Sequence, residues 1–471
     1  MRAPGDRSRT GPDPRAACMA LLAFSLAACS EPEPPIQNVV LISIDTLRFD
    51  HVGLYGAERG VTPVLDGLGA RGVVFDQAVA QAPWTIPSHA TMLTSLYPSV
   101  LGVGPYADPG KLSDAAVTLA EVFRERGFAT AAVTGGYVSQ ALGFDQGFDS
   151  FRETPGEPTM ARAVNLAVQW LDQRDPARPF FLFLHTFEVH QYRPHARFRE
   201  LWVRPYDGPL RELESVPAFV QDPANLPRVR ALGGEDWRYL RDLYDACLAS
   251  VDYEIGRLLD GLEARGLRET TLVVVTSDHG EEFGEHGGSG HGYTLFDENL
   301  RVPLLMSHPS LPARRVAQQV RLLDLAPTLA ELAGPPAPAL WQGTSLVPLF
   351  GGASLSLPAF VEHAHRPLKA VREDGAKYVV DARGPRLLFD LAGDAAEREN
   401  LAGADSGRER RLCAALRAFV AAGAADERWR ATPDPSGGEA LRGTLQDLGY
   451  AGAAAEPAAA DREWLELLRC E

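Results

Sequence analysis

The stretch NVVLISID, residues 38–45, is an almost unbroken run of aliphatic residues that ends on an acid. A strand with one face in water would alternate apolar and polar residues, whereas an unbroken run predicts a strand buried on both faces. Strands of this kind form parallel sheets that helices cover on both sides. The stretch therefore predicts an α/β fold and places Asp45 at the carboxyl end of the first strand.

Similar apolar runs recur along the chain, and most of them follow a segment with helical periodicity. The further predicted strands lie at residues 127–135, 179–187, 271–280 and 302–309. The predicted helices lie at residues 114–127, 161–173, 244–266 and 322–334. Strands that alternate with helices in this way indicate a large, mostly parallel central sheet flanked by helices.

The pattern changes after about residue 355. The runs LKAVRED, AKYVVDA and PRLLFDL are short and are separated by turn residues, which is typical of a small antiparallel sheet. A helix predicted at about residues 408–421 would pack on this sheet. We therefore expect a large domain over residues 37–355, an antiparallel subdomain over residues 356–425 and a loosely held tail over residues 426–471.

The first 28 residues resemble a secretory signal. Four arginines precede the apolar run AACMALLAFSLAAC, residues 16–29, which is too short to span a membrane. The ending Leu26-Ala27-Ala28-Cys29 resembles a bacterial lipobox, so we expect cleavage before Cys29, lipidation of its thiol and a tether over residues 29–36. Such a protein would be periplasmic or on the cell surface, with a lipid anchor as its contact with the membrane. The alternative is an ordinary signal peptide in which Cys29 is incidental.

The composition excludes some classes of function. The chain has 471 residues, is 45% hydrophobic and carries a net charge of −16. This balance argues against a nucleic-acid surface, because phosphate backbones are bound by clustered lysine and arginine. An acidic protein can still bind a small anion through a metal ion or a few focused cations.

The cysteines give little constraint. After cleavage and lipidation only Cys247, Cys413 and Cys470 remain, too few for a disulfide framework and in no metal-ligand spacing. One bridge, such as Cys413 to Cys470, could form in an oxidising compartment.

Polar side chains follow three of the predicted strands at the point where each strand ends. They are Asp45, the pair Asp278 and His279, and the group His185, Glu188 and His190. In open α/β sheets, ligands bind beyond the carboxyl ends of the strands. Each residue alone has an ordinary explanation, as a helix cap, a turn former or part of a glycine-rich loop. The prediction of a site therefore rests on their conjunction.

The stretch APWTIPSHATMLTSLYP, residues 82–98, places Thr85 at the start of a predicted helix. Its hydroxyl would stand beside unpaired backbone N–H groups and the positive end of the helix dipole, which favour an anion. We expect Asp45, Asp278 and His279 to hold one divalent metal ion, with Thr85 as fourth ligand and nucleophile. Carboxylates suit hard ions and an imidazole shifts the preference toward Mn or Zn, so the ion stays open among Ca, Mg, Mn and Zn.

Several stretches resemble the sulfatase family within the alkaline phosphatase superfamily. They are NVVLISIDTLRFDHVGLYG, TPVLDGLGARGVVFDQAVAQAPWTIPSHATMLTSLYP, GFDQGFDSF, VVVTSDHGEEFGEHG, HGYTLFDENLRVPLL, LLDLAPTLAELAG and KYVVDARGPRLLFDLAGDAAERENLAG. The resemblance implies an alkaline-phosphatase-like sheet, a small C-terminal antiparallel domain with a packed helix, and the hydrolysis of sulfate esters.

The chain departs from the family at positions that matter for chemistry. Family members carry Cys or Ser in a C/S-x-P-x-R motif, and that side chain is oxidised to formylglycine. Here the motif is Thr85-Ile86-Pro87-Ser88-His89, and threonine cannot give the aldehyde, so no formylglycine is expected. The family's Asp-Asp pair is Asp45-Thr46, its Lys-Trp-His segment is Gly135-Gly136-Tyr137, and the Lys before Arg-Val-Pro is His291. Threonine nucleophiles occur elsewhere in the superfamily on phosphoryl groups, which favours phosphate over sulfate esters mechanistically.

The sequence thus predicts a metal-dependent hydrolase or transferase that acts on a small-molecule or glycan ester of sulfate or phosphate through Thr85. Arg48 or His89 would contact the non-bridging ester oxygens or brace the loop. The alternative is a catalytically degenerate periplasmic lipoprotein that binds sulfated or phosphorylated glycans. The substitutions at Thr85 and His89 favour this alternative, and the retained metal ligands argue against it.

The remaining polar residues have predicted roles around this centre. His190 or His291 would protonate the leaving oxygen, the usual work of a histidine near neutral pH. His185 and Glu188 are expected beside the metal ligands rather than among them. A second metal ion held by Glu188, His190 and His291 is conceivable, but we expect one ion.

Overall fold

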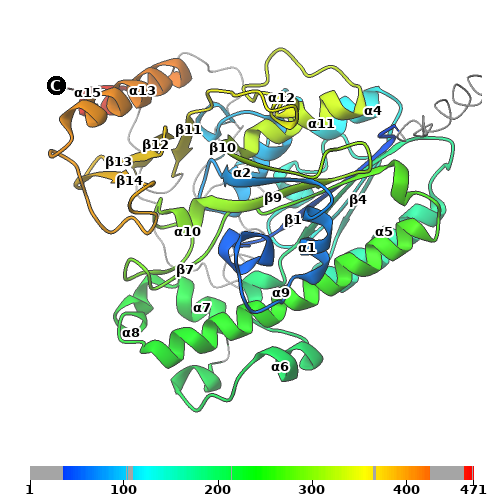
Figure 1. Cartoon of the computed structure of the whole chain (residues 1–471), viewed down its shortest axis with the longest axis horizontal. Coiled ribbons are helices and arrows are strands. Elements are labelled where there is room, and N and C mark those ends of the chain that lie inside the picture. Colours follow the sequence, from blue (N-terminus) through cyan, green and yellow to red (C-terminus); the bar gives the residue numbers. More distant parts are fainter. Residues whose placement is uncertain are drawn as a thin grey trace, which may run out of the picture.

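The computed structural model of the chain describes residues 35–101, 103, 110–156, 158–213, 215–363, 367–424, 461–468 and 470. The expected signal segment and Cys29 lie outside these ranges. Within them, a central sheet lies between two sets of helices, and a smaller sheet with its own helices lies at one end (Figure 1).

Among the described residues, eight strands form the central sheet in the order β10-β2-β9-β6-β1-β5-β3-β4. The strands are β1 Asn38–Ile44, β2 Val73–Val79, β3 Ala129–Thr134, β4 Ser150–Glu153, β5 Phe180–Thr186, β6 Thr271–Thr276, β9 Arg301–Ser307 and β10 Arg314–Arg321. β9 runs antiparallel to both neighbours, and the other neighbouring pairs are parallel. The predicted mostly parallel sheet is confirmed.

The central strand β1 shows why helices cover both faces of the sheet. All of its residues are buried; Val39 and Leu41 belong to one hydrophobic core, and Val40 and Ile42 belong to the other, because side chains alternate along a strand. The helices α2, α4 and α11 cover the first core, and α1, α5 and α9 cover the second (Figure 1). Their bounds are α1 Pro63–Gly69, α2 Thr85–Thr94, α4 Leu119–Glu125, α5 Met160–Gln173, α9 Gly234–Glu263 and α11 Leu325–Ala333.

Shorter elements connect this framework. They are α3 Pro98–Leu101, α6 Ala196–Trp202, α7 Val216–Gln221, α8 Leu226–Val229, α10 Asp297–Leu300, α12 Val347–Phe350 and the paired strands β7 Glu282–Phe283 and β8 Ser289–Gly290.

Several details differ from the predictions: β2, β4 and β10 were not among the predicted strands, and α9 begins ten residues before its predicted start at residue 244. Two of the differences have clear local reasons. The helix α4 begins at Leu119 rather than near residue 114, because Thr118 and Glu121 form a reciprocal capping box at its start. The strand β10 was not expected because its residues, RRVAQQVR, form no apolar run. It lies at the edge of the sheet, where polar residues discourage pairing with other chains.

The C-terminal subdomain is a four-stranded antiparallel sheet in the order β11-β12-β13-β14 with the helix α13 packed on it, as predicted. The elements are β11 Ala359–Glu362, β12 Leu368–Glu373, β13 Ala376–Asp381, β14 Arg386–Asp390, α13 Ser406–Ala424 and α15 Asp461–Leu467.

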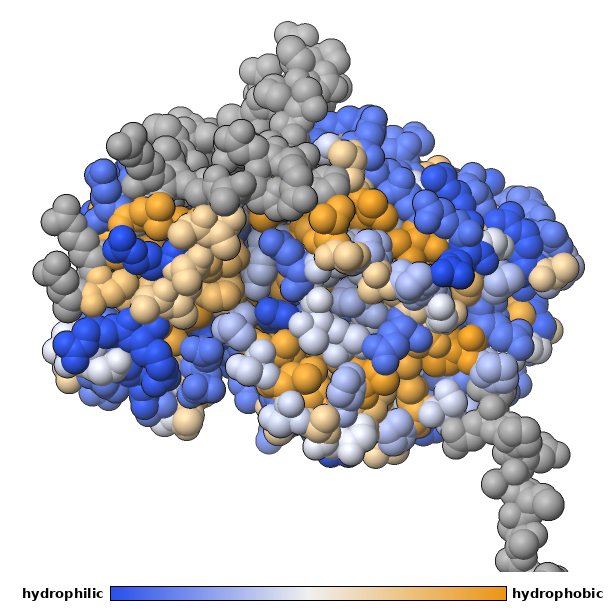
Figure 2. All heavy atoms as spheres, turned by 90° about the horizontal axis from the view of Figure 1, so that it is seen from above, coloured by the Kyte–Doolittle hydropathy of each residue, from blue (hydrophilic) through white to orange (hydrophobic). Residues whose placement is uncertain are grey.

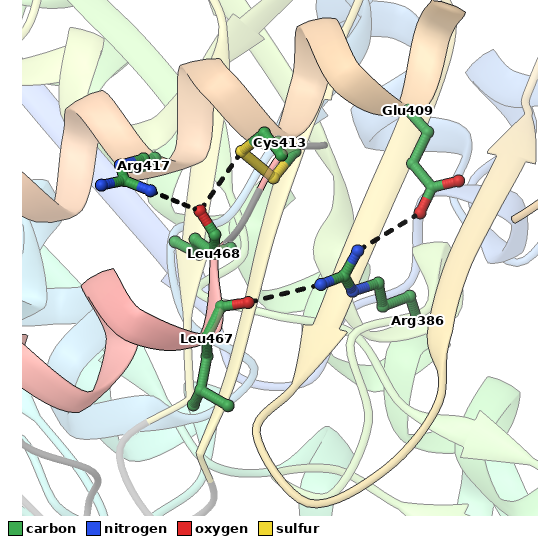
Figure 3. Close-up of a disulfide and its surroundings, with 7 residues drawn as sticks. Arg386, Glu409, Cys413, Arg417, Leu467 and Leu468 are labelled. Carbon is green, nitrogen blue, oxygen red and sulfur yellow. Dashed lines mark hydrogen bonds and ion pairs between the residues drawn. A yellow bond between two sulfur atoms is a disulfide. The ribbon is translucent and has the colours of Figure 1, made fainter. Parts of the chain in front are cut away.

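The last described residues of the tail are held against α13, which corrects the expectation of a loose tail for this part. Trp464 and Leu468 are buried in the core of the subdomain. A disulfide joins Cys413 to Cys470, so the bridge suggested from the sequence is confirmed. Figure 3 shows Arg417 of α13 donating a hydrogen bond to the Leu468 carbonyl at 2.9 Å beside this disulfide.

The surface combines polar and apolar residues. The face shown in Figure 2 is hydrophilic along its right side and has hydrophobic areas toward the middle and left. In the described ranges, the large hydrophobic side chains that stand exposed are Leu201, Tyr253, Leu340 and Leu467. Scattered apolar side chains of this kind are normal on a protein surface. None of the described helices has the length and apolar character needed to cross a membrane.

Candidate active site

Thr85 is the first residue of α2, at the amino end of the helix. Trp84 before it is extended, with φ −159 and ψ 165, and Ser95 ends the helix in a left-handed conformation with φ 55. Thr85 Oγ1 donates to Asp45 Oδ2 at 3.3 Å and lies 3.3 Å from His279 Nε2. The structure therefore brings the predicted nucleophile to the predicted metal ligands.

Asp45, Asp278 and His279 follow β1 and β6, which are parallel neighbours in the sheet. One donor atom of each residue lies within 4.8 Å of the others, and all three residues are buried. Thr46 has φ 59, which is unusual for a β-branched residue, and its N–H donates to Asp278 Oδ1 at 3.3 Å. His279 Nδ1 lies 2.9 Å from the Gly280 carbonyl, so Nδ1–H donates there and Nε2 is left to the cluster.

The cluster fits a divalent cation. Two carboxylate oxygens of the cluster, Asp45 Oδ1 and Asp278 Oδ2, are buried without a hydrogen-bond partner within the part of the chain that the structure describes. The same holds for Nε2 of the neighbouring His185. An unsatisfied buried polar atom costs about 1–3 kcal/mol, and more when it is charged. A divalent ion would satisfy these lone pairs and neutralise both carboxylates, and a mixed oxygen and nitrogen donor set suits Mn or Zn.

The charges around the cluster displace the pKa values of its members. Burial, together with the charge of Asp278, raises the pKa of Asp45 well above its ordinary value. Burial also acts to raise the pKa of Asp278, but the neighbouring histidines outweigh it and lower that pKa. Burial lowers the pKa of His185 to about 4. A cation beside these groups would favour both ionised carboxylates and the neutral imidazole, which are the forms that bind metals.

His185 adjoins the predicted metal ligands. Its Nδ1 bonds the Gly135 carbonyl at 2.9 Å, which turns Nε2 to within 3.4 Å of Asp45 Oδ2. His185, His89 and Asp278 also place donor atoms within 4.8 Å of one another. His185 thus lies beside the predicted ligands, with Nε2 turned toward Asp45, and its place outside the ligand set stays a prediction.

The candidates for gripping the substrate, Arg48 and His89, are held within the protein. His89 Nδ1 donates to the carbonyl of Thr85 at 2.9 Å, and its Nε2 lies 3.0 Å from Ser43 Oγ. The Arg48 guanidinium binds the carboxylates of Asp50 and Glu285, with contacts of 2.7 Å to each. Of the two roles considered from the sequence, the geometry gives both residues the bracing one.

Glu188 does not face the cluster. Its Oε2 accepts the N–H of Met160 at 2.9 Å, at the first residue of α5, where a carboxylate is favourable. No set of three close donor atoms among the described residues joins Glu188 to His190 and His291. The second metal ion that these three residues might have held is therefore not supported.

His190 and His291 adjoin the cluster. The His190 ring stacks on Phe187 with centroids 4.0 Å apart and lies 5.1 Å from the His291 ring. The His291 ring lies 4.4 Å from the His279 ring. Burial lowers the pKa of His190 to about 3 and that of His291 well below its ordinary value. Burial, together with the neighbouring histidines, therefore favours the neutral form of both imidazoles.

Comparison with known proteins identifies the family. The sequence profile described as Sulfatase matches residues 37–335, well over half of the chain. The chain belongs to the sulfatase family. A second profile, described as N-sulphoglucosamine sulphohydrolase, C-terminal, matches residues 284–410 of this sulfatase-family chain. A relative named sulfatase from Formosa agariphila is 26% identical and covers 76% of this chain and 81% of its own.

Solved structures share the fold of this sulfatase-family chain. The phosphonate monoester hydrolase of Agrobacterium radiobacter has a TM-score of 0.66 at 22% identity, covering 83% of this chain and 96% of that chain. A protein solved in complex with its substrate D-glucosamine-2-N,6-O-disulfate has a TM-score of 0.67 at 19% identity, covering 83% of this chain and 99% of that chain. The alkaline-phosphatase-like fold predicted from the sequence is confirmed.

The sulfatase-family site contains two residues that the sequence did not single out. Glu281 is fully buried, and its Oε2 lies 3.2 Å from His291 Nδ1. Burial and the charge of Asp45 raise the pKa of Glu281 well above its ordinary value. Gln221 donates from Nε2 to the same His291 nitrogen at 2.9 Å. Glu281 could have been found from its place two residues after His279, whereas Gln221 lies in a segment without periodicity and gave no signal.

Proposed function

We propose that this sulfatase-family hydrolase cleaves sulfate or phosphate esters with Thr85 as the nucleophile, and that phosphate esters are favoured. The observation that carries the proposal is the position of Thr85 Oγ1, 3.3 Å from both Asp45 Oδ2 and His279 Nε2. The Asp45 carboxylate accepts the hydroxyl proton of Thr85 and so orients the hydroxyl group. The amino end of α2 favours an anionic ester beside that hydroxyl.

Asp45, Asp278 and His279 would hold the metal ion, with His185 Nε2 within reach. Bound there, a divalent ion would lower the pKa of a nearby hydroxyl and neutralise charge on the ester oxygens. Thr85 directs its proton toward Asp45, and Thr85 Oγ1 forms a bond to the phosphorus or sulfur atom while the bond to the leaving oxygen breaks. Water then attacks the threonyl ester and restores the hydroxyl.

The leaving oxygen takes its proton from His190 or His291. Burial lowers the pKa of both side chains, but a negatively charged ester beside the rings favours the imidazolium form. The substrate itself would therefore bring the histidine to its acidic form. Gln221 Nε2 donates to His291 Nδ1 of the neutral ring, whereas Glu281 Oε2 accepts from Nδ1–H of the imidazolium. Either contact fixes the direction of the ring.

Two features support phosphoryl chemistry. Threonine at position 85 cannot supply the formylglycine of the family's sulfate-cleaving mechanism, yet its secondary hydroxyl can attack a phosphate ester directly. One structure of the same fold is named a phosphonate monoester hydrolase. The sulfatase profile supports sulfate esters as the other substrate class.

We also propose that the substrate is a glycan or small-molecule ester outside the cytoplasm, with Cys29 as the lipid anchor. The Cys413–Cys470 disulfide supports export, because such bonds persist in oxidising compartments. The complex of a fold neighbour with D-glucosamine-2-N,6-O-disulfate supports a glycan ester.

Binding without turnover is a second candidate. The internal bonds of Arg48 and His89 favour it, because these cationic or donor side chains are then not directed at ester oxygens. A binder of sulfated or phosphorylated glycans would need no nucleophile, so substitution of Thr85 separates the two functions.

The deciding experiment compares turnover of nitrophenyl sulfate, a phosphate monoester and a phosphate diester, with each metal ion added back to chelated enzyme. We expect phosphate-ester cleavage that falls by about a thousandfold or more in Thr85→Ala and is largely kept in Thr85→Ser, which retains the hydroxyl. Undiminished catalysis in Thr85→Ala would refute the mechanism. Glycan binding without turnover in the wild type would support the second candidate.

A further inference from the structure

A second cluster of metal-type donors lies apart from Thr85. Glu282 in β7, His286 in the turn after it and Glu298 in α10 each place one donor atom within 4.8 Å of the others. Glu282 is 2% exposed and Glu298 9%, and the His286 side chain is 15% exposed. None of the three has a role in the proposed ester chemistry.

His286 is oriented as metal-binding histidines are. Its Nε2 lies 3.3 Å from the Glu397 carbonyl, and its ring lies flat on Phe296 with centroids 3.5 Å apart. The Nε2–H group donates to that carbonyl, so Nδ1 is the ring nitrogen left for a metal ion. In the chain without an ion, Nδ1–H donates to Glu298 Oε1, 2.5 Å away, and an ion bound here would take the place of that proton. A backbone carbonyl that fixes the tautomer through the other ring nitrogen is the common arrangement behind a metal ligand.

The two carboxylates are not balanced by basic side chains. Glu282 accepts hydrogen bonds from Gly288 N at 2.9 Å and Thr294 Oγ1 at 3.4 Å, both from neutral groups. Across the described ranges, Glu282 has no ion pair and Glu298 has one, with His286. Burial and the charge of Glu298 raise the pKa of Glu282. One imidazolium can balance one of these carboxylates, whereas a divalent ion balances both.

A cavity of about 240 Å³ adjoins the cluster and gives it room for further ligands. Glu282 and His286 line it, together with Gly287, Gly288 and Thr294. Three protein donors leave at least one coordination position of a divalent ion for water. The cavity places that water beside Glu282 and His286.

We propose that Glu282, His286 and Glu298 bind a second divalent ion of the Zn²⁺ or Mn²⁺ class, distinct from the ion beside Thr85. One nitrogen and two carboxylate oxygens suit these borderline ions. Ligand atoms on one tetrahedral zinc lie roughly 3.3 Å apart. His286 Nδ1 and Glu298 Oε1 are 2.5 Å apart without the ion, so the distance between them would increase by about 0.8 Å on binding. The ion would join the turn after β7 to α10 and, through the Glu397 carbonyl, to the C-terminal subdomain.

The test is a calorimetric titration of the purified, chelator-treated chain with Zn²⁺. We expect two equivalents per wild-type chain, one in Glu298→Gln, one in Asp278→Asn and none in the double variant. The control Glu331→Gln removes an exposed carboxylate on α11 and should keep both equivalents. If the site beside Thr85 binds no metal, the wild type takes one equivalent and Glu298→Gln still loses it, so the two proposals fail separately.

A Zn²⁺ stoichiometry and affinity in Glu298→Gln equal to those of the control would overturn the second site. Circular dichroism checks that each variant is folded, and His286→Gln provides a second variant that should lose the same equivalent. As an independent measure, Zn²⁺ should raise the melting temperature of Asp278→Asn, because an ion that binds the folded state stabilises it. The same addition should leave the melting temperature of the Asp278→Asn, Glu298→Gln chain unchanged, and an equal rise there would also overturn the site.

Discussion

Ser43 Oγ lies 3.0 Å from Nε2 of His89, which links the strand β1 directly to the helix that carries Thr85. Both side chains are fully buried. Because His89 Nδ1 donates to the Thr85 carbonyl, its Nε2 accepts the hydroxyl proton of Ser43. A residue at the position where the family motif has arginine thus holds the start of α2 against the sheet.

Ser43→Ala should destabilise the protein and lower its activity. The change leaves His89 Nε2 buried without its donor, which costs about 1–3 kcal/mol, and it loosens the helix end that positions Thr85. Urea unfolding measures the loss of free energy, and ester turnover measures the loss of activity. Ser354→Ala, at an exposed serine, should change the free energy of unfolding by less than about 0.5 kcal/mol. Equal effects of the two substitutions would contradict the bracing role.

The parts of the fold that were predictable are those in which burial dictates composition. The strand β1 is buried on both faces, so its sequence is apolar throughout. The edge strand β10 was missed because its polar residues meet solvent. The end of the tail was expected to be loose because the tail is rich in Ala, Gly and Pro. The bridge from Cys413 to Cys470 was suggested from the sequence, but the small core that buries Trp464 was not.

The candidate site was predictable where it follows from topology. Asp45 and Asp278 end neighbouring parallel strands, so their convergence follows from the strand order. The direction in which a side chain points does not follow in the same way. His185 faces the cluster because Gly135 takes its other nitrogen, and Gln221 reaches His291 from 70 residues away in the chain. Such contacts depend on loop conformations that no periodicity encodes.

Cys470→Ser should destabilise the C-terminal subdomain. The disulfide closes a sequence separation of 57 residues onto α13, and a loop of that length corresponds to about 2–4 kcal/mol of stabilisation. Thermal unfolding followed by circular dichroism checks this. Reductant should lower the melting temperature of the wild type toward that of Cys470→Ser and leave the variant unchanged. A wild type that does not respond to reductant, after loss of the bond is verified, would contradict this prediction.

Asp252 should make stability fall as pH rises between about 4 and 7. Its carboxylate in α9 accepts the N–H groups of Val64 and Leu65 at 3.0 and 2.9 Å, yet burial raises its pKa from 3.8 to about 7. The folded state therefore holds a proton that the unfolded chain has released, which gives a negative slope of at most about 1.4 kcal/mol per pH unit.

The slope can be isolated by comparing the free energy of unfolding of the wild type and Asp252→Asn across this pH range. The difference between the two should change with pH, because the variant lacks the titrating group. Asp260→Asn, at an exposed position of the same helix, should run parallel to the wild type. A constant difference between the wild type and Asp252→Asn would show that Asp252 has an ordinary pKa.

Gln221→Leu should lower kcat by about ten- to a hundredfold while changing KM much less. Gln221 contacts His291 Nδ1 at 2.9 Å, and leucine has a similar volume without a donor. If His291 supplies the proton to the leaving oxygen, its misorientation weakens a transition-state interaction and leaves ground-state binding largely intact.

Asp222→Asn is the matched control, because the Asp222 carboxylate faces the Ala224 N–H instead of His291. Steady-state kinetics on the best nitrophenyl ester decides between the two histidines. A kcat equal to that of the control would assign proton transfer to His190, whose ring stacks on Phe187.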